Sequence, residues 1–355
     1  MKNFKIGKKR IGYNQPTYFV ADIAANHDGN LERAKELIYI SADAGADAAK
    51  FQNFKAEKIV SKYGFEHLKD KLSHQSKWKK SVFEVYKDAS ISHDWTSELK
   101  ATCKKAGIDY FTSPYDFDSI DTVDPFVDVY KIGSGDITWL EIIKYMAKKG
   151  KPVMLASGAS TIEDVKRAVN IIIKRTKKIV LMQCNTNYTG SIENFKYINL
   201  NVLKLYKKLY PNVILGLSDH TPGHSTVLGA VALGAKVIEK HFTDDNSRIG
   251  PDHGFAMNPQ TWKEMVDRTR ELELSLGDGI KRIEKNEKKS IVVQRRSLRS
   301  VKNMKVGEII SIEDFESLRP IPKNGLPPYE INKLINKKLI RPLKKGEHIT
   351  WRHIR

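Results

Sequence analysis

Cysteine is scarce in this sequence, because Cys103 and Cys184 are the only two among 355 residues. Two cysteines do not build a disulfide framework, so a reducing cytoplasm is the simplest location. No apolar run approaches the ~20 residues that a membrane-spanning helix needs. The basic N-terminus is not followed by the apolar segment of a secretory signal. We therefore expect a cytoplasmic protein that has no membrane partner.

Short motifs that hold nucleotides or zinc are also missing. The sequence has no Gly-x-x-x-x-Gly-Lys-Ser/Thr loop, no Cys/His spacing typical of zinc and no low-complexity tract. Acidic residues are outnumbered, and the net charge is +19, with 20 Lys and Arg against 8 Asp and Glu in residues 281–355. These basic residues are scattered and carry no aromatic RNA-binding signature, so a solvated surface is favoured and no nucleic-acid partner is expected.

Short apolar runs alternate with amphipathic stretches as far as about residue 276. Eight runs are predicted to be strands, at residues 18–24, 46–52, 108–113, 127–134, 152–157, 178–184, 212–218 and 235–242. Helices are predicted between them, at residues 30–45, 92–107, 161–175, 224–234 and 258–277, on the basis of caps and terminal glycines. This alternation predicts an α/β fold, a (β/α)8 TIM barrel. It is favoured over a doubly wound open sheet, whose usual Gly-rich first turn is absent.

Two further segments interrupt or follow this pattern. Residues 53–92 are polar and aromatic, and they are expected to form an inserted loop with short helices above the barrel. After Gly277 the sequence becomes charged and then rich in Pro and Gly turns between short β-like pieces. We predict a barrel over residues 1–280, a linker over 281–290 and a small, mostly-β domain over 291–355.

Polar residues gather where the predicted strands end, which is where barrel enzymes place their catalytic groups. Strand side chains alternate between two faces, and the polar residues that share one face near these ends are Asp22, Lys50, Gln52, Ser113, Lys131, Ser218, His220, Glu239 and His241, with Ser134 at the exit of the fourth strand. Each one taken alone is an ordinary polar residue at a loop edge, and Lys131 is equally well explained as a salt-bridged barrel lysine. Their convergence favours a site.

The two histidines end neighbouring strands, which lie about 4.8 Å apart in a sheet. His220 and His241 are therefore predicted to share one divalent metal, with positions left open for water and substrate and with no cysteine at the site. Such ligands suit Mn²⁺, Fe²⁺, Co²⁺ or Zn²⁺ better than Mg²⁺. The lysines and serines suit a phosphate-bearing anion. Lys240 has the opposite parity and is expected to pair with a carboxylate behind the barrel wall.

Several ordered motifs resemble the sialic acid synthase family, whose members are phosphoenolpyruvate-dependent nonulosonate synthases with an antifreeze-like (SAF) C-terminal domain. The motifs are ADIAANHDGN (21–30), GADAAKFQNFKAE (45–57), FTSPYD (111–116), YKIGSGDIT (130–138), GKPVMLASG (150–158), GLSDHTPG (216–223), ALGAKVIEKHFTDD (232–245) and GPDH (250–253). In the tail, RRSL (295–298), MKVGE (304–308), LRP (318–320) and KKGEHI (344–349) resemble the SAF module.

The resemblance implies the condensation of phosphoenolpyruvate with the open-chain aldehyde of an N-acylated mannosamine-type sugar and water, with release of phosphate. A divalent metal, most often Mn²⁺, would be held by His220 and His241, and Asp22 or Glu239 would handle the proton of the water. Phosphoenolpyruvate would be held by Lys50, Ser113, Lys131, Ser134, Thr186 and Ser218. The sugar would be held by Gln52, Tyr188, Glu239, Asp252 and, in a domain-swapped homodimer, Arg319 from the other subunit.

The sequence departs from the family pattern at three places. Asp22 replaces the usual Glu, and Ala156 stands where a serine often binds phosphoenolpyruvate. The sixth strand exit, QCNTNYTGS, lacks the usual proline, so Asn185 or Thr186 must supply the donor on the phosphate side.

Three alternatives are left open by the sequence. One is a synthase for a different sugar, a legionaminic or pseudaminic acid precursor, although the Asp-containing GPDH stretch is usually missing from pseudaminic acid synthases. Another is a synthase for a sugar 6-phosphate, against which the SAF-like tail argues. The last is a binding protein for polyanions built on a decayed barrel, which the retained histidines and lysines disfavour.

Overall fold

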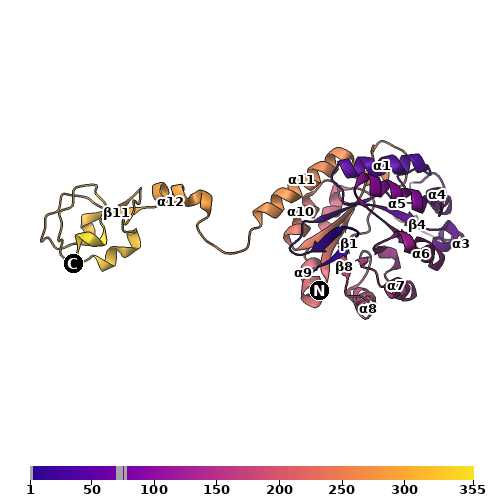
Figure 1. Cartoon of the computed structure of the whole chain (residues 1–355), viewed down its shortest axis with the longest axis horizontal. Helices are drawn as coiled ribbons and strands as arrows, with labels where there is room; N and C mark the ends of the chain where they lie inside the picture. Colours follow the sequence, from indigo (N-terminus) through magenta and orange to yellow (C-terminus); the bar gives the residue numbers. More distant parts are fainter. Residues whose placement is uncertain (1–2, 69–74, 76–77) are drawn as a thin grey trace. The chain divides into compact units, whose positions relative to one another are not determined.

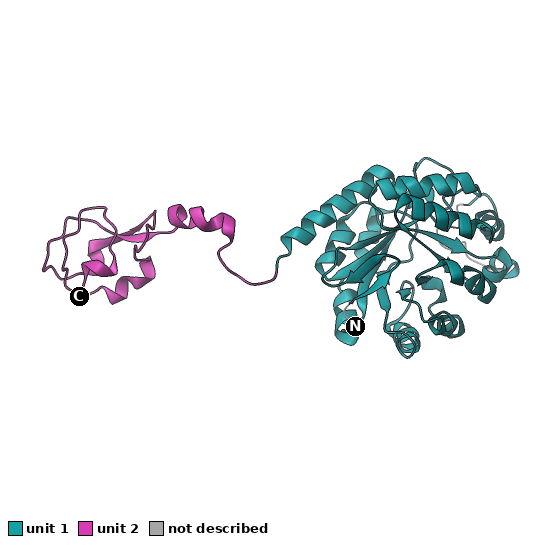
Figure 2. Ribbon diagram, viewed as in Figure 1, with its two compact units in different colours: residues 1–277 teal, residues 278–355 magenta. Residues whose placement is uncertain are grey.

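The computed structural model describes residues 3–68, 75 and 78–355. The chain divides into two compact units, residues 1–277 and residues 278–355. Figure 2 shows the two units in different colours. Each unit has its own hydrophobic core, and each is described separately below.

The first unit is a closed parallel barrel of eight strands in the order β10-β3-β4-β5-β6-β7-β8-β9. The strands are β3 (Tyr18–Asp22), β4 (Ala48–Asn53), β5 (Asp109–Pro114), β6 (Tyr130–Ile132), β7 (Val153–Ala156), β8 (Ile179–Cys184), β9 (Ile214–Asp219) and β10 (Ala235–His241). All eight predicted strands are present, and the predicted barrel is confirmed. Strand β6 is shorter than the predicted run 127–134.

Helices surround the barrel, as Figure 1 shows. The predicted ones are α1 (Leu31–Asp43), α5 (Trp95–Ala106), α8 (Ile162–Ile173), α10 (Ser225–Ala232) and α11 (Pro259–Ser275). Asn30, Thr161 and Asn258 cap the N-termini of α1, α8 and α11 through their side chains. Three more helices, which the sequence pattern did not predict, are α6 (Phe117–Val123), α7 (Leu140–Lys148) and α9 (Val202–Leu209).

A β-hairpin that the sequence pattern did not predict precedes the barrel. Strands β1 (Asn3–Ile6) and β2 (Lys9–Gly12) pair in antiparallel fashion and bury Phe4, Ile6 and Ile11 in the barrel core. Lys9 pairs with Asp47, the residue before β4. The hairpin therefore packs at the N-terminal ends of the strands, which leaves the opposite end available for a site.

The inserted segment after β4 contains the expected short helices. They are α2 (Ala56–Ile59), α3 (Lys62–Glu66) and α4 (Val82–Ala89), and Ser81 and Glu84 form a capping box at the start of α4. The remainder of the segment includes positions outside the described residues.

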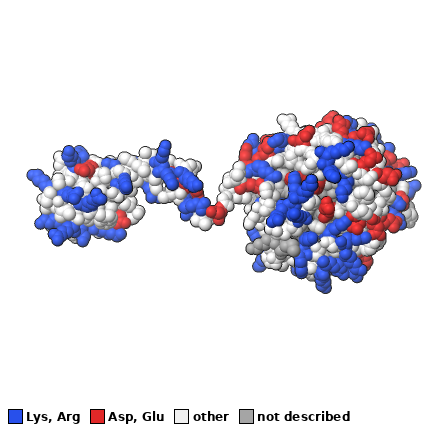
Figure 3. Space-filling view, in the orientation of Figure 1, with Lys and Arg blue, Asp and Glu red and all other residues white. Residues whose placement is uncertain are grey.

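The second unit has helix α12 (Lys288–Gln294) and a two-stranded antiparallel sheet of β11 (Ser297–Ser300) and β12 (Phe315–Leu318). Isolated β-bridges and short 3₁₀ helices connect the rest around a small core, whose fully buried members include Leu334 and Ile349. Figure 3 shows Lys and Arg side chains spread over the visible face of this unit. In the described part of the whole chain, no helix has the length and apolarity to span a membrane.

Candidate active site

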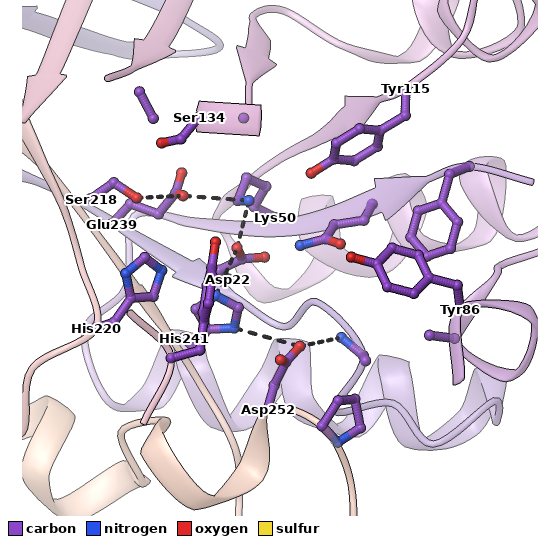
Figure 4. Close-up of a pocket in the computed structure, with 18 of the residues that line it drawn as sticks. Asp22, Lys50, Tyr86, Tyr115, Ser134, Ser218, His220, Glu239, His241 and Asp252 are labelled. Carbon is purple, nitrogen blue, oxygen red and sulfur yellow. Dashed lines mark hydrogen bonds and ion pairs between the residues drawn. The ribbon is translucent and has the colours of Figure 1, made fainter. Parts of the chain in front are cut away.

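Strand register sets the polar residues of the barrel at two levels near its open end. At one level His241 pairs with Asp22, and Asp22 pairs with Lys50 on β4. At the neighbouring level Ser218 on β9 pairs with Glu239 on β10. Because alternate residues of a strand face the same side, both levels point into one cavity, which Figure 4 shows.

Two lysines and two carboxylates form an almost fully buried charge network in this cavity. Lys50 Nζ lies 2.6 Å from Asp22 Oδ2 and 3.4 Å from Glu239 Oε1. Lys131 Nζ lies 3.0 Å from the same Glu239 oxygen. Burial opposes ionisation of Glu239, but Lys131 and Lys50 outweigh it and lower its pKa to about 2. The network therefore carries two positive and two negative charges that balance.

Asp22 and Lys50 respond differently to the same burial. Burial raises the pKa of Asp22, and the nearby Lys50 only partly offsets this effect. For Lys50, burial lowers the pKa, but the attraction of Asp22 and Glu239 prevails and the pKa is raised. Asp22 Oδ1 and Glu239 Oε2 are buried without a hydrogen-bond partner among the described residues. These oxygens remain available to a ligand.

His220 and His241 lie side by side with ring centroids 5.4 Å apart. His220 Nδ1 lies 2.9 Å from the carbonyl oxygen of Asn185, so Nδ1 carries the proton and Nε2 of the neutral ring carries none. Burial, reinforced by neighbouring positive charge, lowers the pKa of both histidines to about 3. Both imidazoles are therefore neutral near pH 7, the form that binds metals.

The donor set fits an open metal centre. His241 Nδ1 is a buried atom without a hydrogen-bond partner among the described residues, and two neutral imidazoles are suitable ligands for Mn²⁺ and similar ions. No group of three or more His, Cys, Asp or Glu side chains is placed to hold an ion within the described part of the chain. The protein would thus supply two ligands, and water or substrate oxygens would supply the rest.

A small hydroxyl-lined region lies at the ends of β6, β7 and β8. Ser134 Oγ accepts a hydrogen bond of 2.9 Å from the backbone N–H of Gly158. A Cβ on Gly158 would lie 2.6 Å from the Thr186 methyl group and 3.1 Å from Cys184 Sγ, so these residues pack closely around it. The Asn185 side chain instead donates to the carbonyl of Tyr197. The donor on the phosphate side, which was expected from Asn185 or Thr186, therefore stays a prediction.

Cys184 corrects one expectation. The site was predicted to be free of cysteine, yet Cys184 ends β8 and lies in the cavity wall. Burial raises the pKa of its thiol, so Cys184 stays protonated and is not a thiolate ligand at neutral pH. Ala156 also lines the cavity. Ser157 faces away and bonds to the Met182 carbonyl and the Tyr206 hydroxyl, so it does not replace the missing serine.

The proposed sugar contacts lie around the same cavity. Gln52, Tyr188 and Asp252 are part of its wall. Tyr188 packs against His220, with ring centroids 4.3 Å apart. Burial raises the pKa of Asp252 to about 7, and its Oδ2 accepts a hydrogen bond from the Ala25 N–H at 3.3 Å.

Three predicted residues lie outside the described cavity wall, and their roles stay predictions. Ser113 is buried and its Oγ has no hydrogen-bond partner among the described residues. The Thr186 methyl group packs beside Gly158, which is also outside that wall. Arg319 is an exposed residue of the second unit, at the end of β12.

An aromatic part of the wall was missed. Phe54 packs against Tyr86 of α4 and Tyr115 after β5, with ring centroids 5.5 and 5.9 Å apart. In Figure 4 the two tyrosines lie across the cavity from His220 and His241. The aromatic content of residues 53–92 was a signal for this wall, but nothing in the sequence showed which rings would face inward.

The outward-facing lysine behaves as predicted. Lys240 Nζ lies 2.5 Å from Asp219 Oδ2 and from the carbonyl oxygen of Thr221. Both charged residues are buried on the side of the sheet opposite the cavity. Lys240 therefore has a structural partner, while Glu239 and His241 face the site.

The fold and the cavity place this chain among (β/α)8-barrel enzymes. It belongs to the NeuB family, whose model matches residues 37–281, and a SAF domain model matches residues 295–355. The N,N'-diacetyllegionaminic acid synthase of Campylobacter jejuni is 34% identical over 94% of this chain and 98% of its own length. The human N-acetylneuraminate-9-phosphate synthase is 29% identical over 96% of this chain and 93% of its own length.

A solved structure is similar over most of the chain. The N-acetylneuraminic acid (sialic acid) synthetase of Leptospira borgpetersenii, in complex with citrate, superposes with a TM-score of 0.72 at 27% identity. The match covers 82% of this chain and 95% of that one. The predicted family is confirmed by these comparisons.

Proposed function

We propose that this protein is a nonulosonic acid synthase that joins phosphoenolpyruvate to the aldehyde of an N-acylated mannosamine-type sugar. C3 of the enol forms the new bond to C1 of the sugar, water adds at C2, and the C2–O bond to phosphate breaks. The products are a nine-carbon 2-keto acid and phosphate. The observation that carries this proposal is a buried, charge-balanced network of two lysines and two carboxylates beside two neutral histidines.

The chain's own groups would divide the work between the two substrates. Lys50 and Lys131 would exchange part of their contact with Glu239 for the phosphoenolpyruvate anion, with hydroxyl donors from Ser134 and Ser218. Either Asp22 or Glu239 would take the proton of the attacking water. Gln52, Tyr188 and Asp252 would orient the sugar chain. The buried location keeps competing water away from the enol phosphate.

A divalent cation, with Mn²⁺ as the preferred candidate, fits His220 and His241. When bound it would supply Lewis-acid activation of the aldehyde. Charge supports this assignment: the network is balanced and both imidazoles are neutral, so an anionic substrate gains no net attraction from the side chains of the network alone.

The function is tested by phosphate release in the presence of phosphoenolpyruvate, Mn²⁺ and one sugar at a time. The sugars are N-acetylmannosamine, its 6-phosphate and the diacetamido precursor of legionaminic acid. We expect release with an unphosphorylated sugar, and loss of that release in His241→Ala. The exposed His67→Ala is the matched control and should keep full activity. A fully active His241→Ala variant would refute the two-histidine site.

The unphosphorylated sugar is preferred because of the cavity's cations. Lys50 and Lys131 are the lysines of the wall among the residues that the structure describes, and both already face carboxylates. The SAF-like tail does not decide between an unphosphorylated sugar and a sugar 6-phosphate, because the human N-acetylneuraminate-9-phosphate synthase matches 96% of this chain. Phosphate release with N-acetylmannosamine 6-phosphate but not with the unphosphorylated sugars would assign the protein to the synthases that act on a sugar 6-phosphate.

We also propose that Arg319 completes the site of a partner subunit in a swapped dimer, and subunit mixing tests this idea. His241→Ala and Arg319→Ala should each be inactive as pure proteins. After they are mixed and allowed to exchange subunits, a heterodimer would contain one site with both residues intact, so activity should return. No recovery in verified heterodimers would mean that Arg319 does not act across subunits.

A further inference from the structure

His253 follows Asp252 directly, but it has no part in the chemistry described above. Asp252 lies in the cavity wall, whereas the His253 side chain is fully buried and outside that described wall. A fully buried histidine needs partners for its ring nitrogens. Those partners show what the residue holds together.

Both ring nitrogens of His253 are engaged by other segments. Nε2 lies 2.9 Å from Asp28 Oδ1, in the loop after β3. Nδ1 lies 2.7 Å from the hydroxyl oxygen of Thr243, just after β10. Strands β3 and β10 are neighbours that close the barrel. The imidazole therefore joins the loops that follow these two strands.

Asp28 is itself fixed by a charged network. Its Oδ2 lies 3.0 Å from Arg33 Nε, and the guanidinium of Arg33 makes a forked pair with Asp244 at 2.9 and 2.6 Å. Such bidentate pairs constrain both distance and orientation. Arg248 adds a second cation, 3.2 Å from Asp244. Asp28 therefore bonds to His253 through one carboxylate oxygen and is held in place by Arg33 through the other.

The loop is shaped to receive the imidazole. A Cβ on Gly250 would lie 2.6 Å from Cδ2 of His253, so a side chain at position 250 would displace the ring. Asn246 Nδ2 donates to the carbonyl oxygens of His253 and Ala256, at 2.8 and 2.7 Å. The backbone on both sides of the histidine is therefore fixed as well.

We propose that His253 and Asp28 are positioning residues for the sugar. By tying the loop of residues 250–253 to the loop after β3, they hold the Asp252 carboxylate at the cavity, against the Ala25 N–H, before the sugar arrives. This inference rests on the proposed function, because it takes Asp252 to be a sugar contact. A pre-positioned carboxylate lowers the ordering cost of sugar binding.

Two matched substitutions separate the bonds of His253. His253→Gln can still donate to Asp28, whereas His253→Asn can bond only to Thr243, and His253→Leu loses both. With Mn²⁺ and phosphoenolpyruvate present, we expect His253→Leu to raise the KM of the sugar about tenfold, which corresponds to the cost of ordering one side chain on binding. The KM of phosphoenolpyruvate should change less than about twofold. His253→Gln should recover more sugar affinity than His253→Asn.

A double mutant shows whether His253 acts through Asp252. In the Asp252→Asn background the His253→Leu change should add little to the sugar KM, because residues that act through one group are not additive. An additive loss, or equal changes in the KM of both substrates, would overturn the proposal. Equal recovery by Gln and Asn would overturn the role of Asp28.

Hydrogen exchange keeps the inference separate from the proposed function. The proposal predicts faster amide exchange at residues 249–257 in His253→Leu and unchanged exchange in the barrel strands. If the wild type releases no phosphate with any sugar, the proposed function fails, and exchange still decides whether the histidine holds the loop. Unchanged amide exchange in that loop would refute the positioning role of His253, even if the enzyme is active.

Discussion

Replacing Lys240 by Met should destabilise the barrel without weakening substrate binding. Methionine fills a similar volume but leaves Asp219 as a buried carboxylate without its cation. Asp219 keeps hydrogen bonds from the hydroxyls of Thr221 and Thr226, each at 2.8 Å. Breaking a buried ion pair costs about 3–5 kcal/mol, and these remaining donors place the expected loss near the lower end, about 3 kcal/mol.

Thermal unfolding measures this loss. In a domain the size of this barrel, 1 kcal/mol shifts Tm by about 2–4 °C, so the melting temperature of Lys240→Met should fall by roughly 6–12 °C. The KM of both substrates should stay within about twofold, because Lys240 faces away from the cavity. Strand alternation accounts for this difference, since the flanking Glu239 and His241 face the other way and line the site.

The double mutant Lys240→Met/Asp219→Asn is the control. It removes both charges, so no uncompensated carboxylate remains, and it should melt above the single mutant Lys240→Met. A Tm for Lys240→Met within about 2 °C of the wild type would refute the reasoning. So would a double mutant that is less stable than either single mutant.

Three other substitutions probe the cavity. Glu239→Gln removes the negative charge that both lysines face, so the Kd of phosphoenolpyruvate, measured by calorimetry, should fall several-fold while kcat also falls. Weaker binding of phosphoenolpyruvate would contradict the charge balance. Gly158→Ala should raise the KM of phosphoenolpyruvate, because the added methyl group would crowd Ser134 and Thr186. Gly135→Ala is the control, since a methyl group there meets no described atom within 4 Å. An equal rise in KM in both variants would contradict the crowding argument. Burial raises the pKa of Asp252 to about 7, so the stability that Asp252 contributes is present below pH ~4 and is lost as the pH rises through 7. Asp252→Asn should therefore raise Tm at pH 8 and not at pH 4. An equal change in Tm at both pH values would refute the raised pKa.

The inner part of the site could be predicted because it lies on regular strands. Strand alternation fixes which side chains face inward, and parallel pairing sets strand ends at matching levels, so Lys50, Glu239, His220 and His241 follow from period and order alone. The same parity correctly separated Lys240 from its neighbours. Cys184 obeyed the rule too, and its place at the end of β8 should have prevented the expectation of a cysteine-free site.

The outer part of the site could not be predicted in the same way. Phe54 and Tyr86 reach the cavity from the insertion after β4, where the direction of a side chain depends on how the short helix α4 packs and not on strand alternation. His253 was part of a quoted motif, but its two partners lie 10 and 225 residues away in the sequence. Such contacts depend on loop geometry, which local pattern does not encode.

Register also explains how the shorter carboxylate at position 22 can serve. Asp22 stands at the same level as both Lys50 and His241, between the strands that carry them. From there its Oδ2 already lies 2.6 Å from the Lys50 ammonium and 3.6 Å from His241 Nε2. An extra methylene is therefore not required for the carboxylate to reach either group. The unpartnered Oδ1 is then free to face the substrate water, so the departure from the usual Glu is compatible with the proposed reaction.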